Sequence, residues 1–84
     1  MAKDKIDFHT FNIDDKWLKM ILNGEKKSEI RRYCLPLEGK KVGLMSNNTN
    51  KIEAIITIAK VDNEFRKYYP CNYLYQIKQV ERVH

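Results

Sequence analysis

The sequence contains no apolar run close to the roughly 20 residues that a membrane-spanning helix needs. Its opening residues, MAKDKIDF, also lack the apolar core of a secretory signal peptide. We therefore expect a cytoplasmic protein with no membrane partner. Only 3 glycines occur, and they form no glycine-rich phosphate loop. The paired H-x-E and C-x-x-C motifs and the acidic loop of EF-hands are also missing, so we expect no bound metal and no cofactor.

Cysteine is scarce as well. The 2 cysteines, Cys34 and Cys71, lie far apart and outside any C-x-x-C pattern. In a reducing compartment such residues are typically free thiols, so the pattern favours neither a redox pair nor zinc ligation.

The length and charge of the chain limit its architecture and its partners. With 84 residues, 43% hydrophobic and 32% charged, the chain is expected to fold as one domain, residues 1–84, with a thin core. The formal charge of +5 and the isoelectric point near 9.3 favour a polyanionic partner. The lysines are spread along the sequence, so any basic surface must be assembled by folding.

The N-terminal part predicts a strand followed by an amphipathic helix. Residues 5–9 alternate between apolar and polar and predict a short strand. The helix is indicated by apolar residues at helical spacing: Ile13, Trp17, Met20 and Ile21, with Leu18 and Leu22 widening the stripe. Asn12 or Asp14 is the expected N-cap, and Asn23 with Gly24 ends the helix. The position of Trp17 favours core packing, with a cleft wall as the alternative.

The next predicted strand, residues 26–33, is unusually rich in charge. Strand periodicity places Lys27, Glu29, Arg31 and Tyr33 on one face and Lys26, Ser28, Ile30 and Arg32 on the other. Neither face is cleanly hydrophobic, which is typical of a strand that lines a functional cleft or lies exposed. Glu29 and Arg31 fit an ion pair that orients the guanidinium toward a ligand, or a surface pair that contributes less than about 1 kcal/mol.

The rest of the chain reads as strands joined by turns. In order, we expect a turn at 35–39, a strand at 42–45, a polar loop at 46–50, a long strand at 52–61, a loop or single helical turn at 62–69, and a last strand at 72–83. The fold class is therefore α+β: a small, closed or nearly closed β-barrel of about five strands with one main helix. A parallel βαβ architecture is not expected, because only one helix is long enough for a crossover.

The spacing G-x-K-x-x-E-x-R, from Gly24 to Arg31, resembles the signature of ASCH domains, a branch of the PUA-like folds. Gly39, Val42 and Leu44 match the second part of that pattern, G-x-x-V-x-L. The resemblance covers residues 5–83. It implies a PUA-like barrel in which the signature charges meet RNA or a nucleotide-like ligand in a cleft between helix and barrel.

Some members of this family are amidohydrolases that act on acylated cytidine. Their catalytic set is a lysine, a threonine three residues later and a downstream glutamate. In this chain Lys26 matches the lysine, Glu29 stands at the threonine position, and Glu53 or Glu64 could supply the glutamate. The resemblance therefore supports an enzyme only weakly.

Six residues are the candidate ligand contacts: Lys26, Glu29, Arg31, Trp17, Lys27 and Tyr33. The first hypothesis is a non-catalytic module that binds RNA, single-stranded nucleic acid or a nucleotide-like ligand in a basic cleft. The second is a hydrolase in which Lys26 and Glu29 form an acid–base pair. The third is a protein-binding inhibitor or accessory factor on the same scaffold. The tyrosines fit base-stacking platforms, or half-buried packing positions on the strands.

Overall fold

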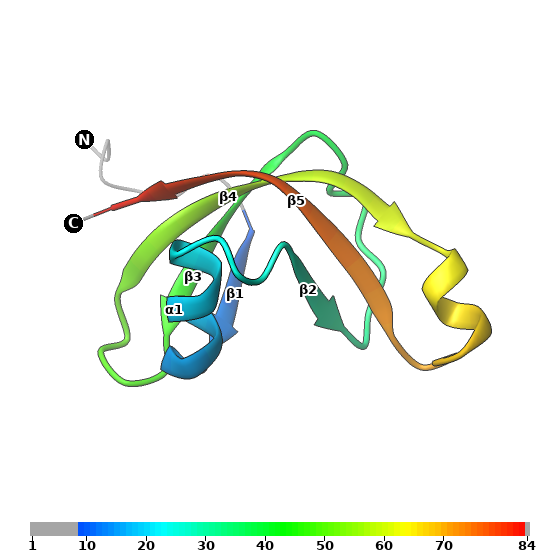
Figure 1. The fold of residues 1–84 in the computed structure, drawn as a ribbon, viewed down its shortest axis with the longest axis horizontal. Coiled ribbons are helices and arrows are strands. Elements are labelled where there is room, and N and C mark those ends of the chain that lie inside the picture. The colour runs from blue at the N-terminus through cyan, green and yellow to red at the C-terminus, as the bar shows by residue number, and fades with distance from the viewer. Residues whose placement is uncertain (1–8, 84) are drawn as a thin grey trace.

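Five strands, one α-helix and one 3-10 helix form within residues 9–83, the part of the chain that the computed structural model describes (Figure 1). In chain order they are β1 (Thr10–Ile13), α1 (Asp15–Leu22), β2 (Ser28–Arg31), β3 (Lys41–Ser46), β4 (Ile52–Asp62), η2 (Glu64–Lys67) and β5 (Tyr73–Arg82). The order of strand, helix and four further strands agrees with the prediction. Neither helix in this part of the chain combines the length and the apolar character needed to cross a membrane.

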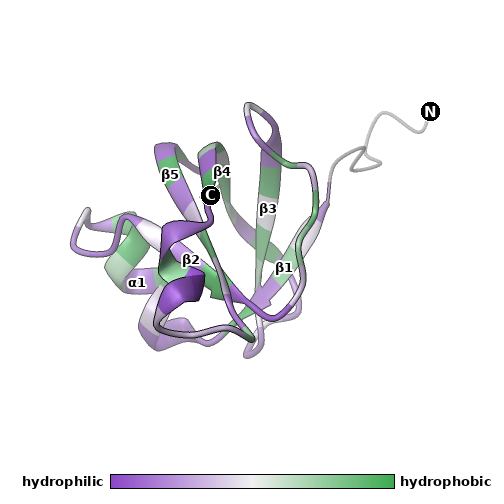
Figure 2. Cartoon of the chain, turned by 90° about the vertical axis from the view of Figure 1, so that its right-hand side faces the viewer, coloured by the Kyte–Doolittle hydropathy of each residue, from purple (hydrophilic) through white to green (hydrophobic). Residues whose placement is uncertain are grey.

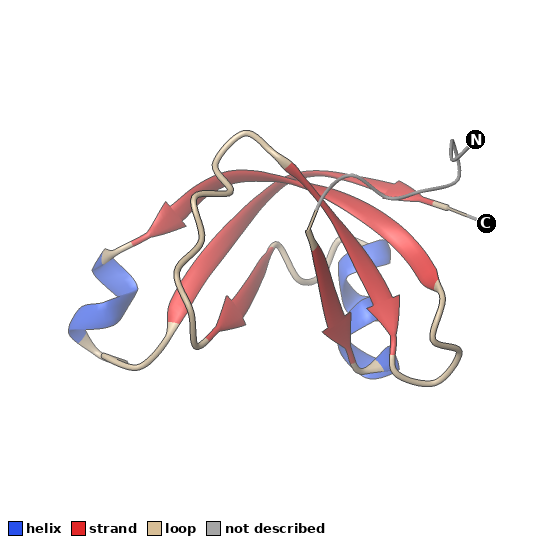
Figure 3. Ribbon diagram, turned by 180° about the vertical axis from the view of Figure 1, so that it is seen from behind, coloured by secondary structure: helices blue, strands red, loops and turns tan. Residues whose placement is uncertain are grey.

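All five strands belong to one curled sheet in the order β1-β3-β4-β5-β2. The long strands β4 and β5 form an arch, and the shorter strands hang from its two sides (Figure 3). β1 and β3 pair in parallel and the other pairs are antiparallel. The chain returns from β1 to β3 through both α1 and β2, so the sheet contains one parallel crossover, which we did not expect; the single helix together with β2 makes the connection long enough.

The sheet is a half-barrel, and this is more open than the closed or nearly closed barrel that we expected. β1 and β2 are its two edge strands, and each pairs with one neighbour only. We call the unpaired side between them the seam. The α+β, barrel-like character is confirmed, and the helix closes one end of the concave side (Figure 1).

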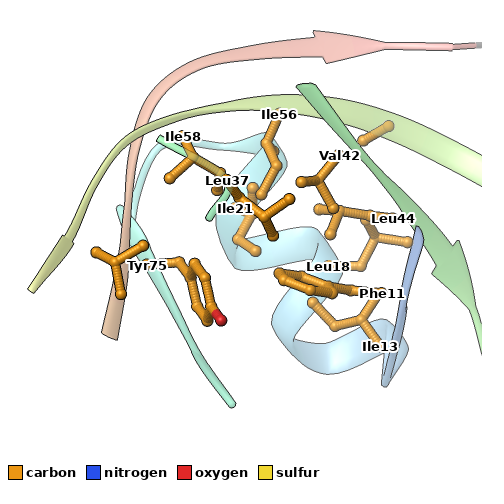
Figure 4. Close-up of a cluster of buried hydrophobic side chains, with 12 residues drawn as sticks. Phe11, Ile13, Leu18, Ile21, Leu37, Val42, Leu44, Ile56, Ile58 and Tyr75 are labelled. Carbon is orange, nitrogen blue, oxygen red and sulfur yellow. The ribbon is translucent and has the colours of Figure 1, made fainter. Parts of the chain in front are cut away.

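The core lies on the concave side of the half-barrel, between the sheet and α1 (Figure 4). It consists of Phe11, Ile13, Leu18, Ile21, Leu37, Val42, Leu44, Ala54, Ile56, Ile58, Val61 and Tyr75. Hydrophobic and hydrophilic residues alternate along the long strands, which sends one set inward (Figure 2). Each large apolar side chain that is fully buried stabilises the fold by about 1.5–3 kcal/mol.

Two predictions about the N-terminal part need correction. Residues 5–8 of the predicted first strand lie outside the described residues, and β1 begins one position after His9. Ile13 belongs to β1, in which its side chain is 2% exposed, and it is not part of the helix. With Ile13 removed from the stripe, the helix buries Leu18 and Ile21, and Trp17 is left 40% exposed at the flank of the buried face.

The start of α1 is tied to the turn between β3 and β4. Asp14 is the N-cap residue, and its side chain makes no capping hydrogen bond. The carboxylate of Asp15 instead accepts hydrogen bonds from the Ser46 hydroxyl (2.5 Å) and the Asn48 amide (2.8 Å). The Ser46 bond lowers the pKa of Asp15 more than desolvation raises it, and Asn48 and the charge of Lys19 lower this pKa further.

Candidate functional site

The loop after α1 places Lys26 beside β2. Asn23 is the C-cap, and Gly24 follows with φ +86°, a left-handed conformation that glycine adopts without strain. The backbone N–H of Lys26 then donates to the carbonyl of Met20 (3.0 Å). The chain therefore reverses tightly, and the predicted helix end at Asn23 and Gly24 is confirmed.

The three signature charges come together around one carboxylate. Glu29 Oε1 lies 3.2 Å from Lys26 Nζ, and Glu29 Oε2 lies 2.8 Å from Arg31 Nη2. The Glu29 side chain is 9% exposed, and the two cationic side chains are each 19% exposed. We call this group the Lys26–Glu29–Arg31 triad. Its net charge is positive, because one carboxylate faces two cations.

On the β2 side of the seam, the triad covers a free edge of the sheet. The carbonyl of Lys27 accepts the Ile77 N–H (2.9 Å) from β5. In an antiparallel ladder the backbone groups alternate, so those of Ser28 and Ile30 point away from β5. Lys26 Nζ donates to the outward carbonyl of Ser28. The ammonium thus caps an edge group that β5 leaves unpaired.

On the β1 side, Arg31 has the corresponding role. The carbonyl of Ile13 accepts the Asn47 N–H (2.9 Å), so the carbonyl of the preceding residue, Asn12, points toward the seam. Arg31 Nη2 donates to that Asn12 carbonyl (2.7 Å), and the guanidinium carbon lies 4.5 Å from the centroid of the Phe11 ring. Arg31 therefore bridges the two edge strands. Charged groups placed on edge strands in this way also prevent pairing with another chain.

An exposed indole lies next to the triad. Trp17 has two ammonium groups near its ring, with Lys16 Nζ at 4.8 Å and Lys26 Nζ at 6.0 Å from the ring centroid. A pocket of about 370 Å³ opens here, lined by Trp17, Lys26, Glu29 and Ile30. Trp17 and Ile30 supply apolar walls and are 40% and 42% exposed. Such a pocket can accept a flat ring against the indole and an anionic group beside the lysines.

The structure separates the other two candidates from this pocket. Lys27 is exposed and lines a different pocket, next to β5. Tyr33 is 40% exposed, its ring meets Phe11 edge-on at 6.2 Å, and its carbonyl accepts the Tyr75 hydroxyl (2.6 Å). Sequence reasoning missed Lys16 and placed Ile30 only on a mixed face. The position of Lys16 next to Trp17 was the only available signal.

The tyrosines divide into buried and exposed groups. Tyr75 is fully buried, and desolvation raises the pKa of its hydroxyl, so it cannot serve as a stacking platform. Tyr68 and Tyr69 are 78% and 56% exposed around η2, at the opposite end of the molecule from α1 (Figure 1). Arg66 lies over the Tyr73 ring at 4.5 Å and donates to the carbonyl of Pro70 (3.1 Å), so its guanidinium is already engaged.

The remaining chemistry of the site region is limited. Cys34 and Cys71 are both free and exposed. Within residues 9–83, no three histidine, cysteine or acidic side chains are grouped so that they could hold a metal ion. The candidate site therefore consists of the indole, the neighbouring lysines and the triad.

No protein-family model matches the sequence, and no curated protein matches it. The interpretation of the site consequently depends on its geometry and on the motif residues.

Proposed function

We propose that this chain is a small nucleic-acid-binding domain of the ASCH type, which holds RNA, another single-stranded nucleic acid or a nucleotide-like ligand against Trp17. The observation that carries the proposal is an exposed indole with two lysines near its ring, at the mouth of a pocket. Bases stack on aromatic side chains irrespective of sequence, and ammonium groups attract the neighbouring phosphates. The formal charge of +5 supports the same class of ligand.

The proposal gives different roles to the members of the site. Trp17 stacks on a base, and Lys16 and Lys26 contact phosphate oxygens. Arg31 acts through Glu29, because its Nη2 already donates to that carboxylate and to the Asn12 carbonyl. Arg31 and Glu29 are therefore not ligand contacts. They link the edge strands, and the Glu29 carboxylate offsets part of the positive charge at the pocket, while the Ser28 carbonyl also holds the ammonium of Lys26.

Titration with single-stranded RNA tests this proposal directly. Trp17 is the only tryptophan, so stacking of a base should quench its fluorescence. For the variants without an indole, the fluorescence anisotropy of labelled RNA measures binding: Trp17→Ala should weaken it by about 1–3 kcal/mol, a factor of about 5 to 150, and Trp17→Phe should restore part of the affinity. Lys26→Gln should weaken binding and reduce the salt dependence, with a log–log slope smaller by about 0.7.

The chain offers a matched control for the aromatic substitution. Tyr68 is 78% exposed and lies on the segment that follows η2, far from α1 (Figure 1). Tyr68→Ala removes an exposed aromatic ring without touching the pocket and should bind RNA like the wild type. RNA binding that is absent at low salt, or that depends on Tyr68 and not on Trp17, would exclude the proposal. Incubation with acylated cytidine, followed by a search for released cytidine, tests the hydrolase alternative on the same preparation.

A further inference from the structure

A second pocket lies where the loop after α1 meets β5. It has a volume of about 330 Å³, and its lining includes Gly24, Lys26, Lys27, Lys78 and Gln79. Lys26 also lines the pocket beside Trp17, so the two pockets are neighbours that share one lysine. The surface from the indole to β5 is thus continuous through Lys26.

The charge of this second pocket is uniformly positive. Three lysines line it, and its lining contains no acidic side chain. Across residues 9–83, no carboxylate lies within ion-pair distance of Lys27 or Lys78, whereas Lys41 and Lys67 each have an acidic partner. An anion at this place would therefore meet two cations, Lys27 and Lys78, without an acidic partner, beside Lys26, which is paired with Glu29.

Strand pairing explains why these lysines converge. The carbonyl of Lys27 accepts the Ile77 N–H (2.9 Å), which places the start of β2 beside the middle of β5. On its other side β5 contains a bulge: Gln79 pairs with Thr57 and Ile77 with Ile58, so Lys78 has no partner on β4. A β-bulge re-aims the side chain of the extra residue. Here it contributes a third lysine to the pocket.

We propose that Lys27, Lys78 and Gln79 form a second anion subsite, which takes a backbone phosphate of the nucleic acid whose base stacks on Trp17. This inference deepens the proposed function and rests on it. Because two neighbouring subsites each take part of one ligand, the ligand is a strand of several nucleotides and not a free nucleotide. An amide beside two ammonium groups suits phosphate oxygens, which accept several hydrogen bonds at once.

The test compares two ligands and two double variants. The ligands are uridine monophosphate and a single-stranded RNA of about eight nucleotides, a length within the range that small domains cover. The variants are Lys27→Gln with Lys78→Gln, and a control with the same change in charge, Lys40→Gln with Lys51→Gln. Thermal melting verifies that each variant is folded, and Trp17 fluorescence follows binding.

The subsite variant should bind the oligonucleotide about tenfold more weakly than the wild type at 0.1 M salt, with a log–log slope smaller by about 0.7 for the one lost phosphate contact. Its affinity for uridine monophosphate should be unchanged, and the control variant should bind both ligands like the wild type. Equal losses for subsite and control variants would overturn the subsite.

The two proposals fail in different ways. Wild-type protein that binds neither ligand refutes the proposed function and the subsite with it. Wild-type protein that binds both ligands through Trp17, with no effect of the Lys27 and Lys78 changes, refutes the subsite alone.

Discussion

Replacing Glu29 by glutamine should have opposite effects on stability and on ligand binding. The Glu29 carboxylate holds Lys26 Nζ at 3.2 Å and Arg31 Nη2 at 2.8 Å, and its side chain is only 9% exposed. Glu29→Gln keeps the shape of the side chain and removes its charge. Both cations then lose their ionic partner, while the pocket beside Trp17 becomes more positive.

The structure bounds the loss of stability. A hydrogen bond to a charged group contributes about 1.5–3 kcal/mol, and breaking a fully buried ion pair costs about 3–5 kcal/mol. Here Lys26 keeps the Ser28 carbonyl, Arg31 keeps the Asn12 carbonyl, and both side chains are 19% exposed and can be hydrated. We therefore expect a loss of about 2 kcal/mol, or a melting temperature lower by roughly 8–16 °C in a domain of this size.

The gain in binding follows from the same change of charge. Two unit charges about 4 Å apart interact by about 1 kcal/mol in a water-like dielectric, so removing the carboxylate should tighten RNA binding by a factor of about 5. Binding must be measured well below the melting temperature of the variant, because only folded protein presents the pocket.

Urea denaturation followed by circular dichroism measures the stability, and RNA titration measures the binding. Glu81→Gln is the matched control: Glu81 pairs with Lys41 at 3.8 Å, and both side chains are about half exposed. Loss of that surface pair should cost less than about 1 kcal/mol. If Glu29→Gln unfolds at the same urea concentration as Glu81→Gln, the triad does not stabilise the seam. If it is folded and binds RNA more weakly, the proposed role of Lys26 is wrong.

Three further predictions concern the scaffold. Tyr75→Phe removes a hydroxyl that donates to the Tyr33 carbonyl (2.6 Å), and it should lower the free energy of unfolding by about 1–2 kcal/mol in urea denaturation. Ile56→Ala leaves a cavity in the fully buried core and should lower the free energy of unfolding by about 2–5 kcal/mol in the same measurement. A smaller loss than that of Ile56→Val would contradict the packing of Ile56 in the core. The Ser46 hydrogen bond lowers the pKa of Asp15 in the folded state, so the stability that it gives is present above pH 3.8 and is lost as the pH falls through the lower, folded-state pKa. The stability difference between wild type and Asp15→Asn should therefore shrink as the pH is lowered through this range, and a difference that is constant with pH would refute that assignment.

Local sequence signals predicted much of the scaffold. The alternation of β-branched residues located β4, and Asn23 with Gly24 located the end of α1, because both signals act over a few neighbouring residues. The motif spacing likewise indicated Lys26 and Glu29 as site residues, and their side chains do form an ion pair. These features depend on short-range geometry, which the sequence expresses directly.

The rest of the site depends on pairing between distant segments. Nothing near Arg31 indicates that it reaches Asn12, since that contact requires the two edge strands of a half-barrel to face each other. The approach of Lys27 to Lys78 needs both the β2–β5 register and a bulge opposite β4. The exposure of Trp17 was misjudged because Ile13 ends a strand and does not begin the helix.

The pairing of β2 with β5 has a consequence for the order of events during folding. β2 hydrogen-bonds to β5 alone within the sheet, and the partners Ser28 and Gln76 are far apart in sequence. Segment 28–31 therefore has no partner in the sheet until segment 73–76 is available. Pairing of strands that lie far apart in the sequence is slow, because closing the long loop between them costs conformational entropy before the contacts form. The charges of Glu29 and Arg31 disfavour pairing of the free segment with another chain before β5 is in place.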